Sequence, residues 1–345
     1  MKRREFVGAG LAVAGAGMLG MRPAYAQSKQ IVVTNWGGDW NGRTVKHIEA
    51  PLLESKGWTI VRDLNEQPQR MTKILAERRL PRGTVDVAHF ADGEAYTLNV
   101  QEALEAIDYS KIPNAATMIP KMKQPYFMPW LYSAWEVVYL ADRIKDPVTS
   151  YADMWNPKYA GKIGVMDQNY GAAMQVASIV AGGKMDNFEG AKKLLLEWKK
   201  AVQPKIYPSH QQAQAALKAD EIWMMGNWKA RGLQWQKDGL NVRVASPKEG
   251  GIHTVFGVVI PKRAANKDGA HAYLNALIDP EGMRNLCSDN FYAPPTTAVS
   301  IPGEVGAKIA FTPAQTAALH YYDHKYWAEN ITKWLDWWKK DFVGS

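Results

Sequence analysis

The chain has 345 residues, a formal net charge of +8 at pH 7, 46% hydrophobic residues, 22% charged residues and one cysteine. This composition is typical of a globular protein, and a single cysteine excludes an intrachain disulfide. The basic residues are dispersed and form no arginine-rich arm, which argues against a nucleic-acid partner. We expect the one cysteine, Cys287, to be a buried small apolar residue and not a nucleophile.

The first 26 residues have the pattern of an export signal. Arg3 and Arg4 precede a run of mostly small or apolar residues over 6–21, and Ala24 and Ala26 stand before Gln27. The paired arginines indicate the Tat route, and the apolar run is shorter than the roughly 20 residues of a membrane-spanning helix. We therefore expect a periplasmic protein that is cleaved after Ala26. ATP and NAD(P)H are scarce there, so we expect no cofactor.

The remaining 319 residues are long enough for two domains, and they begin with alternating strands and helices. β-branched and apolar runs predict strands at 31–34, 58–61 and 85–89. Apolar residues at helical spacing predict helices at 44–53 and 71–78. This βαβαβ order favours a mainly parallel sheet covered by helices.

A second run of the same kind is expected after residue 150. The chain then returns to the first part, so two α/β lobes joined by more than one extended crossing are predicted. Asp186 or Asn187 is expected to cap the helix at 188–198, and Ser209 the helix that ends at 218. The expected strands are 135–140, 163–166, 222–225 and 252–260, and the other expected helices are 172–180, 268–277 and 280–287.

The last part of the chain carries an aromatic stripe and two histidines. Trp327, Trp334 and Trp338 recur at helical spacing, which favours a helix docked on a lobe over a helix lying on a membrane surface. His320 and His324 are four residues apart on the same expected helix, without the glutamate of a zinc protease. The tyrosine pair 321–322, of a kind that ferric-ion carriers use, has no clear companions. We therefore expect no metal site.

Aromatic residues cluster in three segments that follow predicted strands: 35–40, 89–92 and 226–231. In open α/β sheets, ligands bind outside the carboxyl ends of strands. Gly37 and Gly38 let a ligand approach the backbone, and tryptophan faces hold apolar stems or cationic groups. The chain has neither a G-x-S-x-G nucleophile elbow nor a Walker A loop, so we expect a binding protein and not an enzyme.

Two specific segments carry a family resemblance. Residues 149–162 read T-S-Y-A-D-M-W-N-P-K-Y-A-G-K, and residues 247–251 read P-K-E-G-G. With the aromatic-then-proline loop at 292–295, these segments resemble the bacterial periplasmic solute-binding proteins of the spermidine/putrescine group, which serve ABC importers. The likeness runs over almost all of the mature chain.

The resemblance implies a type II clamshell of two α/β lobes, each a mainly parallel sheet flanked by helices. One lobe would comprise 27–136 and 256–300, and the other 137–255 and 301–345, which ends in a C-terminal helix. A solute would bind between the lobes, which close around it and dock on an inner-membrane permease. A monomer is expected. Trp36 and Trp228 align with aromatic ligand contacts of the group, Asp167 lies in the matching second-lobe loop, and Tyr292 lies near the loop aromatic.

The departures from the group concern its acidic residues. The chain has Gln168, Asn169 and Tyr170 where the group has further acidic residues, and Thr254 and Phe256 where it has a tryptophan and an aspartate. A dication would be poorly compensated there. Arg231, His253 and the glycine N–H groups are suited to a carboxylate instead. The expected ligand-binding residues are Trp36, Gly37, Gly38, Asp39, His89, Phe90, Asp167, Tyr170, Trp228, Arg231, His253, Thr254, Phe256 and Tyr292.

These departures predict an amino-acid-like, opine-like or organic-acid ligand. Three alternatives stay open from the residues. The ligand is a polyamine as in the rest of the group, the chain is an exported hydrolase or ferric-ion carrier, or the clamshell serves a structural or signalling role without transport.

Overall fold

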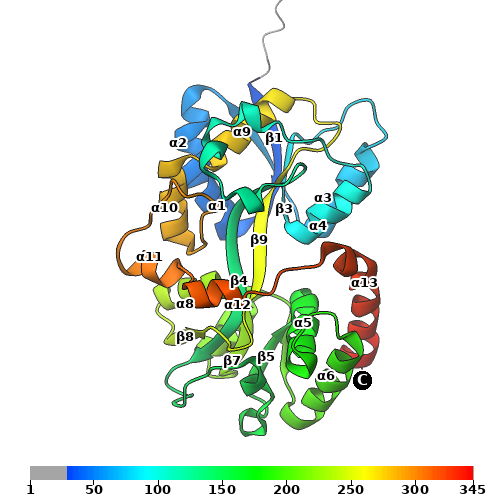
Figure 1. Ribbon diagram of the computed structural model, residues 1–345, viewed down its shortest axis with the longest axis vertical. Helices are drawn as coiled ribbons and strands as arrows, with labels where there is room; N and C mark the ends of the chain where they lie inside the picture. The colour runs from blue at the N-terminus through cyan, green and yellow to red at the C-terminus, as the bar shows by residue number, and fades with distance from the viewer. Residues whose placement is uncertain (1–28, 345) are drawn as a thin grey trace, which may run out of the picture.

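Figure 1 shows two lobes, one above the other, with two long strands running between them. This computed structural model describes residues 29–344, so the expected export signal and its cleavage point lie outside the described residues. Within 29–344, none of the helices is both long enough and apolar enough to cross a membrane.

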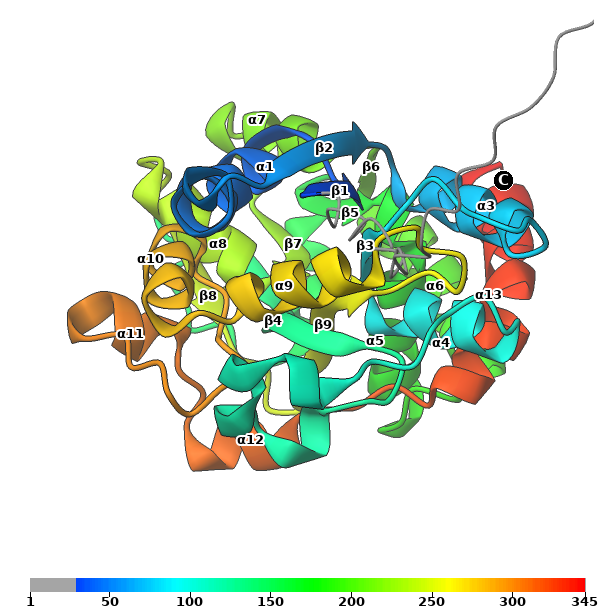
Figure 2. The same cartoon turned by 90° about the horizontal axis from the view of Figure 1, so that it is seen from above.

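The first lobe is built on three parallel strands. Strand β1 lies between β2 and β3, and its buried residues alternate with more exposed ones before the strand reaches the interlobe side. Helices cover both faces of these strands (Figure 1 and Figure 2), as the βαβαβ order predicted. The strands are β1 (Gln30–Asn35), β2 (Thr59–Leu64) and β3 (Val87–Ala91). The helices are α1 (Gly38–Thr44), a π-helix (Val45–Glu49), α2 (Ala50–Leu52), α3 (Gln67–Glu77), α4 (Asp92–Val100), α9 (Lys267–Leu277) and α10 (Pro280–Asn290).

The second lobe is also built on parallel strands that are followed by helices. Strand β5 pairs in parallel with β6 and β7, and helices follow these strands. Asn187 and Ser209 cap α6 and α7 through their side chains, as expected. The strands are β5 (Ile163–Met166), β6 (Lys205–Tyr207), β7 (Met224–Trp228) and β8 (Val242–Ala245). The helices are α5 (Tyr170–Gly182), α6 (Phe188–Val202), α7 (His210–Lys218) and α8 (Lys229–Lys237).

Strands β4 (Met128–Leu140) and β9 (Ile252–Val259) join the two lobes as an antiparallel pair. They make one continuous sheet in the order β2-β1-β3-β9-β4-β7-β5-β6, with β8 paired to β4. The lobe boundaries expected at 136/137 and 255/256 fall inside these two strands. They remain a prediction.

Several elements differ from the expected ranges. The helix expected at 44–53 begins at Gly38 and contains a π-helical turn, and β3 ends two residues later than expected. β4 begins at Met128, seven residues before the predicted start. Pro129 lies at a register shift in the pairing with β9, and the pairing continues on both sides of that shift. Two short helices, α11 (Gly303–Ile309) and α12 (Pro313–Ala318), were not predicted.

The C-terminal helix α13 (His324–Trp337) continues as a π-helix over Trp338–Val343. Trp334 and Trp338 are buried in the core of the second lobe, so the aromatic stripe docks on a lobe as expected. The histidine pair does not share this helix. His320 lies before it, where its N–H donates to the Gly251 carbonyl, and only His324 is helical.

The N-terminal end of α13 also contacts the first lobe. Figure 1 shows α13 beside α4 above and α5 below. The Trp327 ring packs against Gly93 of α4 and Gly171 of α5. His324 stacks on Tyr96 with ring centroids 5.7 Å apart. One helix end therefore bridges the lobes on this side of β4 and β9.

This bridge makes Gly171 sensitive to substitution. A Cβ at Gly171 would overlap the Trp327 ring, whereas one at the helical Gly42 would meet nothing within 4 Å. We expect Gly171→Ala to lower the free energy of unfolding by about 1–3 kcal/mol, because overpacking displaces the ring. Gly42→Ala should be neutral or slightly stabilising, since alanine favours helix. Thermal and urea unfolding measure both variants, and a neutral Gly171→Ala would contradict the bridge.

Candidate functional site

Five aromatic side chains from both lobes meet beside the crossing strands, and we call them the aromatic wall: Trp36, Trp40, Trp228, Phe256 and Tyr292. Phe256 lies at the centre, with ring centroids 5.8 Å from Trp36, 5.3 Å from Trp40, and 5.5 Å from both Trp228 and Tyr292. Most of these contacts are edge-to-face, the arrangement that aromatic quadrupoles favour. Phe256 therefore contacts three other expected site residues that are far apart in the sequence, Trp36, Trp228 and Tyr292.

The alternation of strand β9 decides which of its residues reach the aromatic wall. Thr254 and Phe256 lie on one face of the strand, and His253 lies on the other. The His253 ring packs 5.4 Å from Tyr132 and 4.8 Å from Tyr321. The structure thus places Phe256 in the wall and His253 on the opposite face, away from Trp36 and Trp228.

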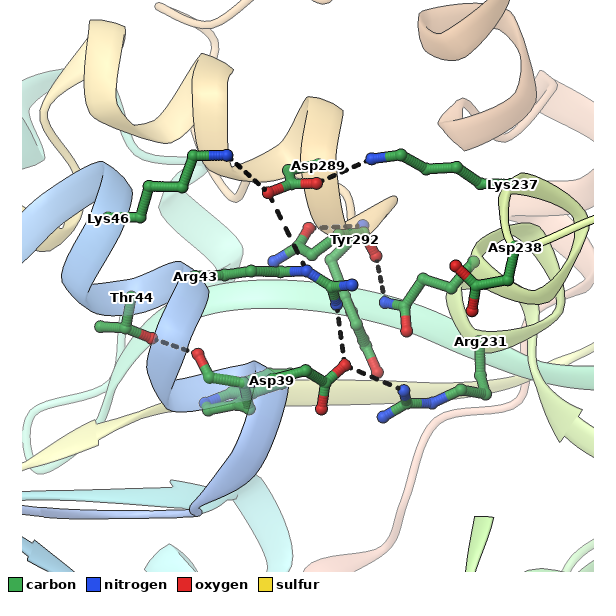
Figure 3. A network of polar contacts seen from close by, with 12 residues as sticks. Asp39, Arg43, Thr44, Lys46, Arg231, Lys237, Asp238, Asp289 and Tyr292 are labelled. Carbon is green, nitrogen blue, oxygen red and sulfur yellow. Dashed lines mark hydrogen bonds and ion pairs between the residues drawn. The ribbon is translucent and has the colours of Figure 1, made fainter. Parts of the chain in front are cut away.

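Charged side chains tie α8 to the first lobe at one edge of the aromatic wall (Figure 3). Arg231 lies 3.4 Å from Asp39, which also accepts a hydrogen bond from Arg43 at 3.0 Å. Asp289 of α10 pairs with Lys237 of α8 at 2.7 Å. Burial opposes ionisation of Asp289, but hydrogen bonds from His47 and Lys237 hold its pKa well below the usual value. The lobes are therefore also in contact on this second side of the crossing strands.

Around the aromatic wall, several buried polar groups have no hydrogen-bond partner within residues 29–344. They include Nε of Arg231, Nε1 of Trp40 and Nδ2 of Asn35, all of which are donors. A buried donor without a partner costs about 1–3 kcal/mol, so native proteins pair such groups with water or a ligand. This donor set fits a ligand group rich in acceptors.

The structure does not bring His89 and Phe90 to the aromatic wall. Both are fully buried inside β3, since that strand continues to Ala91. His89 lies 3.2 Å from the Tyr273 hydroxyl, and burial lowers its pKa well below the usual value. The residues that follow the strand, where ligand contacts are expected, therefore begin with Asp92.

Three charged residues near the end of β3 were not among the ligand-binding residues expected from the sequence. Arg70 of α3 is 1% exposed, and its guanidinium lies 4.2 Å from the Trp36 ring. Asp92 and Glu94 occupy the first turn of α4, where burial raises the pKa of Asp92 to about 8 and that of Glu94 to about 7. Placing the end of β3 two residues later would have identified the two acids. The sequence carries no signal for the stacking of Arg70 on Trp36.

Residues 49–313 match the family of bacterial extracellular solute-binding proteins. The chain belongs to this family. The match covers most of both lobes and both crossing strands. Of the aromatic wall it includes Trp228, Phe256 and Tyr292, whereas Trp36 and Trp40 precede it.

Curated relatives and solved structures agree with this assignment. The spermidine/putrescine-binding periplasmic protein of Escherichia coli is 24% identical over 305 residues, which are 84% of each chain. A GABA receptor structure matches 90% of this chain and 96% of its own with a TM-score of 0.78 and 18% identity. The PBP AgtB of A. tumefaciens R10 in complex with agropinic acid matches 91% and 98%, with a TM-score of 0.74 and 17% identity.

These matches confirm the predicted fold class, a two-lobed periplasmic-binding-protein clamshell, and the resemblance to the spermidine/putrescine group. The protein is a substrate-binding protein of the kind that serves ABC transporters. Such proteins deliver small solutes to membrane permeases. The relatives are transport proteins, and the names of these three describe no catalytic activity. In the described part of the chain, no three His, Cys, Asp or Glu side chains gather as metal ligands.

The remaining expected site residues of this solute-binding protein have other contacts. The Asp167 carboxylate accepts a hydrogen bond from the Trp338 indole at 2.8 Å, and the Tyr170 hydroxyl donates to the Ile331 carbonyl at 3.4 Å. Both are therefore partly engaged by the C-terminal segment. Gly37 and Gly38 are exposed, and a Cβ at either would meet nothing within 4 Å, which leaves their backbone accessible.

Proposed function

We propose that this solute-binding protein is exported, is cleaved after Ala26 and acts as a periplasmic monomer. It captures a small carboxylate-bearing solute between its lobes and delivers it unchanged to an inner-membrane ABC permease. The ligand class is an amino-acid-like, opine-like or organic-acid compound. Closure of the two lobes on the ligand selects it, since contacts from both sides favour the closed form.

The observation that carries this proposal is a pair of arginines with buried N–H donors that have no partner. Nε of Arg231 and both Nε and Nη2 of Arg70 lack a partner among residues 29–344. A guanidinium presents a planar fork of N–H groups that matches a carboxylate. The aromatic wall between the two arginines suits the apolar part of such a solute.

Polyamine binding has one observation in its favour, the acidic pair Asp92 and Glu94. A polyamine must place an ammonium group at each end, however, and the other charged groups beside the wall include Arg70, Arg231 and Asp39. Asp39 already pairs with both Arg43 and Arg231. The second ammonium group would therefore be poorly compensated, and we favour the carboxylate-bearing ligand.

A thermal-shift screen of residues 27–345 tests the proposal with amino acids, opines, small organic acids and spermidine. A ligand at 100 times its Kd stabilises the folded state by about 2.7 kcal/mol, which raises Tm by several degrees. We expect such a rise with carboxylates and none with spermidine. Arg231→Gln should reduce the rise, and Arg243→Gln, at an exposed arginine of β8, should not. A rise with spermidine alone would contradict the proposal.

A further inference from the structure

We propose that Arg70, Asp92 and Glu94 form a single head-group site that takes both the carboxylate and the ammonium group of an aminocarboxylate. The rest of the ligand would then lie against the aromatic wall. This inference rests on the proposed function for the carboxylate. It adds the requirement for an ammonium group, the orientation of the ligand and the residues that read its charged end.

Arg70 is held in place but not satisfied. Nη1 donates to the Asn65 carbonyl, and the guanidinium lies 4.2 Å from the Trp36 ring and 5.3 Å from the Phe90 ring. Its Nε and Nη2 have no hydrogen-bond partner in the described chain, although the residue is 1% exposed. These two N–H groups lie on one edge of the guanidinium, and that edge binds a carboxylate with two parallel hydrogen bonds.

The acidic pair lies at the same end of the first lobe. Asp92 and Glu94 begin α4 directly after β3, and Asp92 accepts a hydrogen bond from the Gly93 N–H at 3.0 Å. Burial raises the pKa of Glu94 and the charge of Arg70 opposes that rise, yet in the part of the chain described here the two side chains form no ion pair within 4.0 Å. Opposite charges are thus close but not joined. A zwitterion satisfies both sides at once.

The head-group site involves both lobes. Burial is the main cause of the raised pKa of Tyr170 of α5 and of Tyr322, and the charge of Glu94 adds to both. The Tyr322 ring also stacks on His324, with ring centroids 6.2 Å apart. His324 of α13 lies 3.7 Å from Asp92. A ligand held there contacts the first lobe through the charged residues and the second through the tyrosines. The titratable groups that face the site are Asp63, Glu66, Arg70, Tyr96, Tyr126, Tyr170, Tyr322 and His324.

Burial gives this site a pH dependence with a defined sign. Because the pKa of Asp92 is raised to about 8 and that of Glu94 to about 7, both carboxyls are mostly neutral at pH 6 and gain charge as the pH rises. A bound ammonium group favours the charged form, so binding releases protons near neutral pH. Affinity for an aminocarboxylate should therefore rise from pH 6 to pH 8. Affinity for the same acid without its amino group should not rise.

Titration calorimetry with matched compounds tests the inference. One set is L-norleucine, hexanoate and pentylamine, and a second set is γ-aminobutyrate, butyrate and propylamine. We expect at least one aminocarboxylate to bind about tenfold or more tightly than both its deaminated and its decarboxylated analogue. Glu94→Gln should reduce that preference over the acid at least about tenfold. Arg70→Gln should weaken the acid and the aminocarboxylate alike.

Controls separate the possible failures. Glu197→Gln, at an exposed carboxylate of α6 outside the group of residues that face the site, should leave both affinities unchanged. Circular dichroism checks that each variant folds, and wild-type titrations in buffers of different ionisation enthalpy measure the released protons without any variant. Acids that bind as tightly as their aminocarboxylates, without proton release, would overturn the head-group site and leave the carboxylate proposal standing. Binding of the amines alone would overturn both.

Discussion

Replacing Trp36 by alanine is expected to weaken ligand binding by about 30-fold or more. Trp36 packs on Phe256 and Trp40 in the aromatic wall, and it also supports the Arg70 guanidinium at 4.2 Å. Its loss removes an apolar contact surface and frees a buried arginine at the same time. Central aromatic anchors of this kind are worth about 2 kcal/mol or more, which corresponds to the stated factor. Calorimetry with the tightest ligand of the screen measures the effect.

Trp58→Ala is the matched control for this prediction. Trp58 is also partly buried against the first-lobe core, but it lies before β2, beside Leu53 and Asn114, on a different part of the lobe surface. The control should unfold more easily and still bind with wild-type affinity. Equal losses of affinity in the two variants would mean that Trp36 acts through stability and not through the ligand.

We expect Gly250→Ala to lower the free energy of unfolding by about 3 kcal/mol. Gly250 has a φ of +93°, and a Cβ there would overlap the backbone carbonyl oxygen of Ala318. The conformation alone costs a non-glycine residue about 1–2 kcal/mol, and overpacking against backbone adds about 1–3 kcal/mol. Chemical denaturation measures the loss, and the ligand-induced rise in Tm shows whether the folded fraction still binds.

Gly239→Ala isolates the contribution of the contact. Gly239 has nearly the same φ, +89°, but a Cβ there would meet nothing within 4 Å. It should therefore lose only about 1 kcal/mol, which is the conformational part. If both variants lose the same free energy, then the close approach of Gly250 to Ala318 has no energetic weight.

The two segments that carry the family resemblance, 149–162 and 247–251, contact each other next to Gly250. The Lys248 N–H donates to the Thr149 carbonyl at 2.7 Å, and Glu249 accepts hydrogen bonds from Ser150 and Tyr151. The His320 ring lies 2.7 Å from the Glu249 carbonyl. The two segments that carried the resemblance are therefore parts of one contact at the base of β9.

Local patterns were sufficient for most of the regular structure. Ile163–Met166 is the strand that its apolar run predicted, and Ser209 caps α7 through its own side chain. The tryptophan stripe is the buried face of α13, and Cys287 is buried. Periodicity and capping predicted these outcomes, and both can be recognised from residues that are close together in the sequence. The family resemblance added the two-lobed arrangement.

The site depended on relations that no local pattern contains. His89 and Phe90 were predicted to contact the ligand. The pairing of β3 with β9 continues to Ala91 and buries both side chains, so neither belongs to the aromatic wall, although Phe90 packs against Arg70. Tertiary packing places Arg70 over Trp36 and brings His324 within 3.7 Å of Asp92, which is more than 200 residues away in the chain.

By itself, the sequence determined the fold class, the family and the aromatic segments, because those follow from short-range periodicity and from contiguous motifs. Only the tertiary structure decided which aromatic and charged side chains come together beside the crossing strands. That outcome follows from the register of the crossing strands and from the docking of α13, since both bring together residues that are distant in sequence.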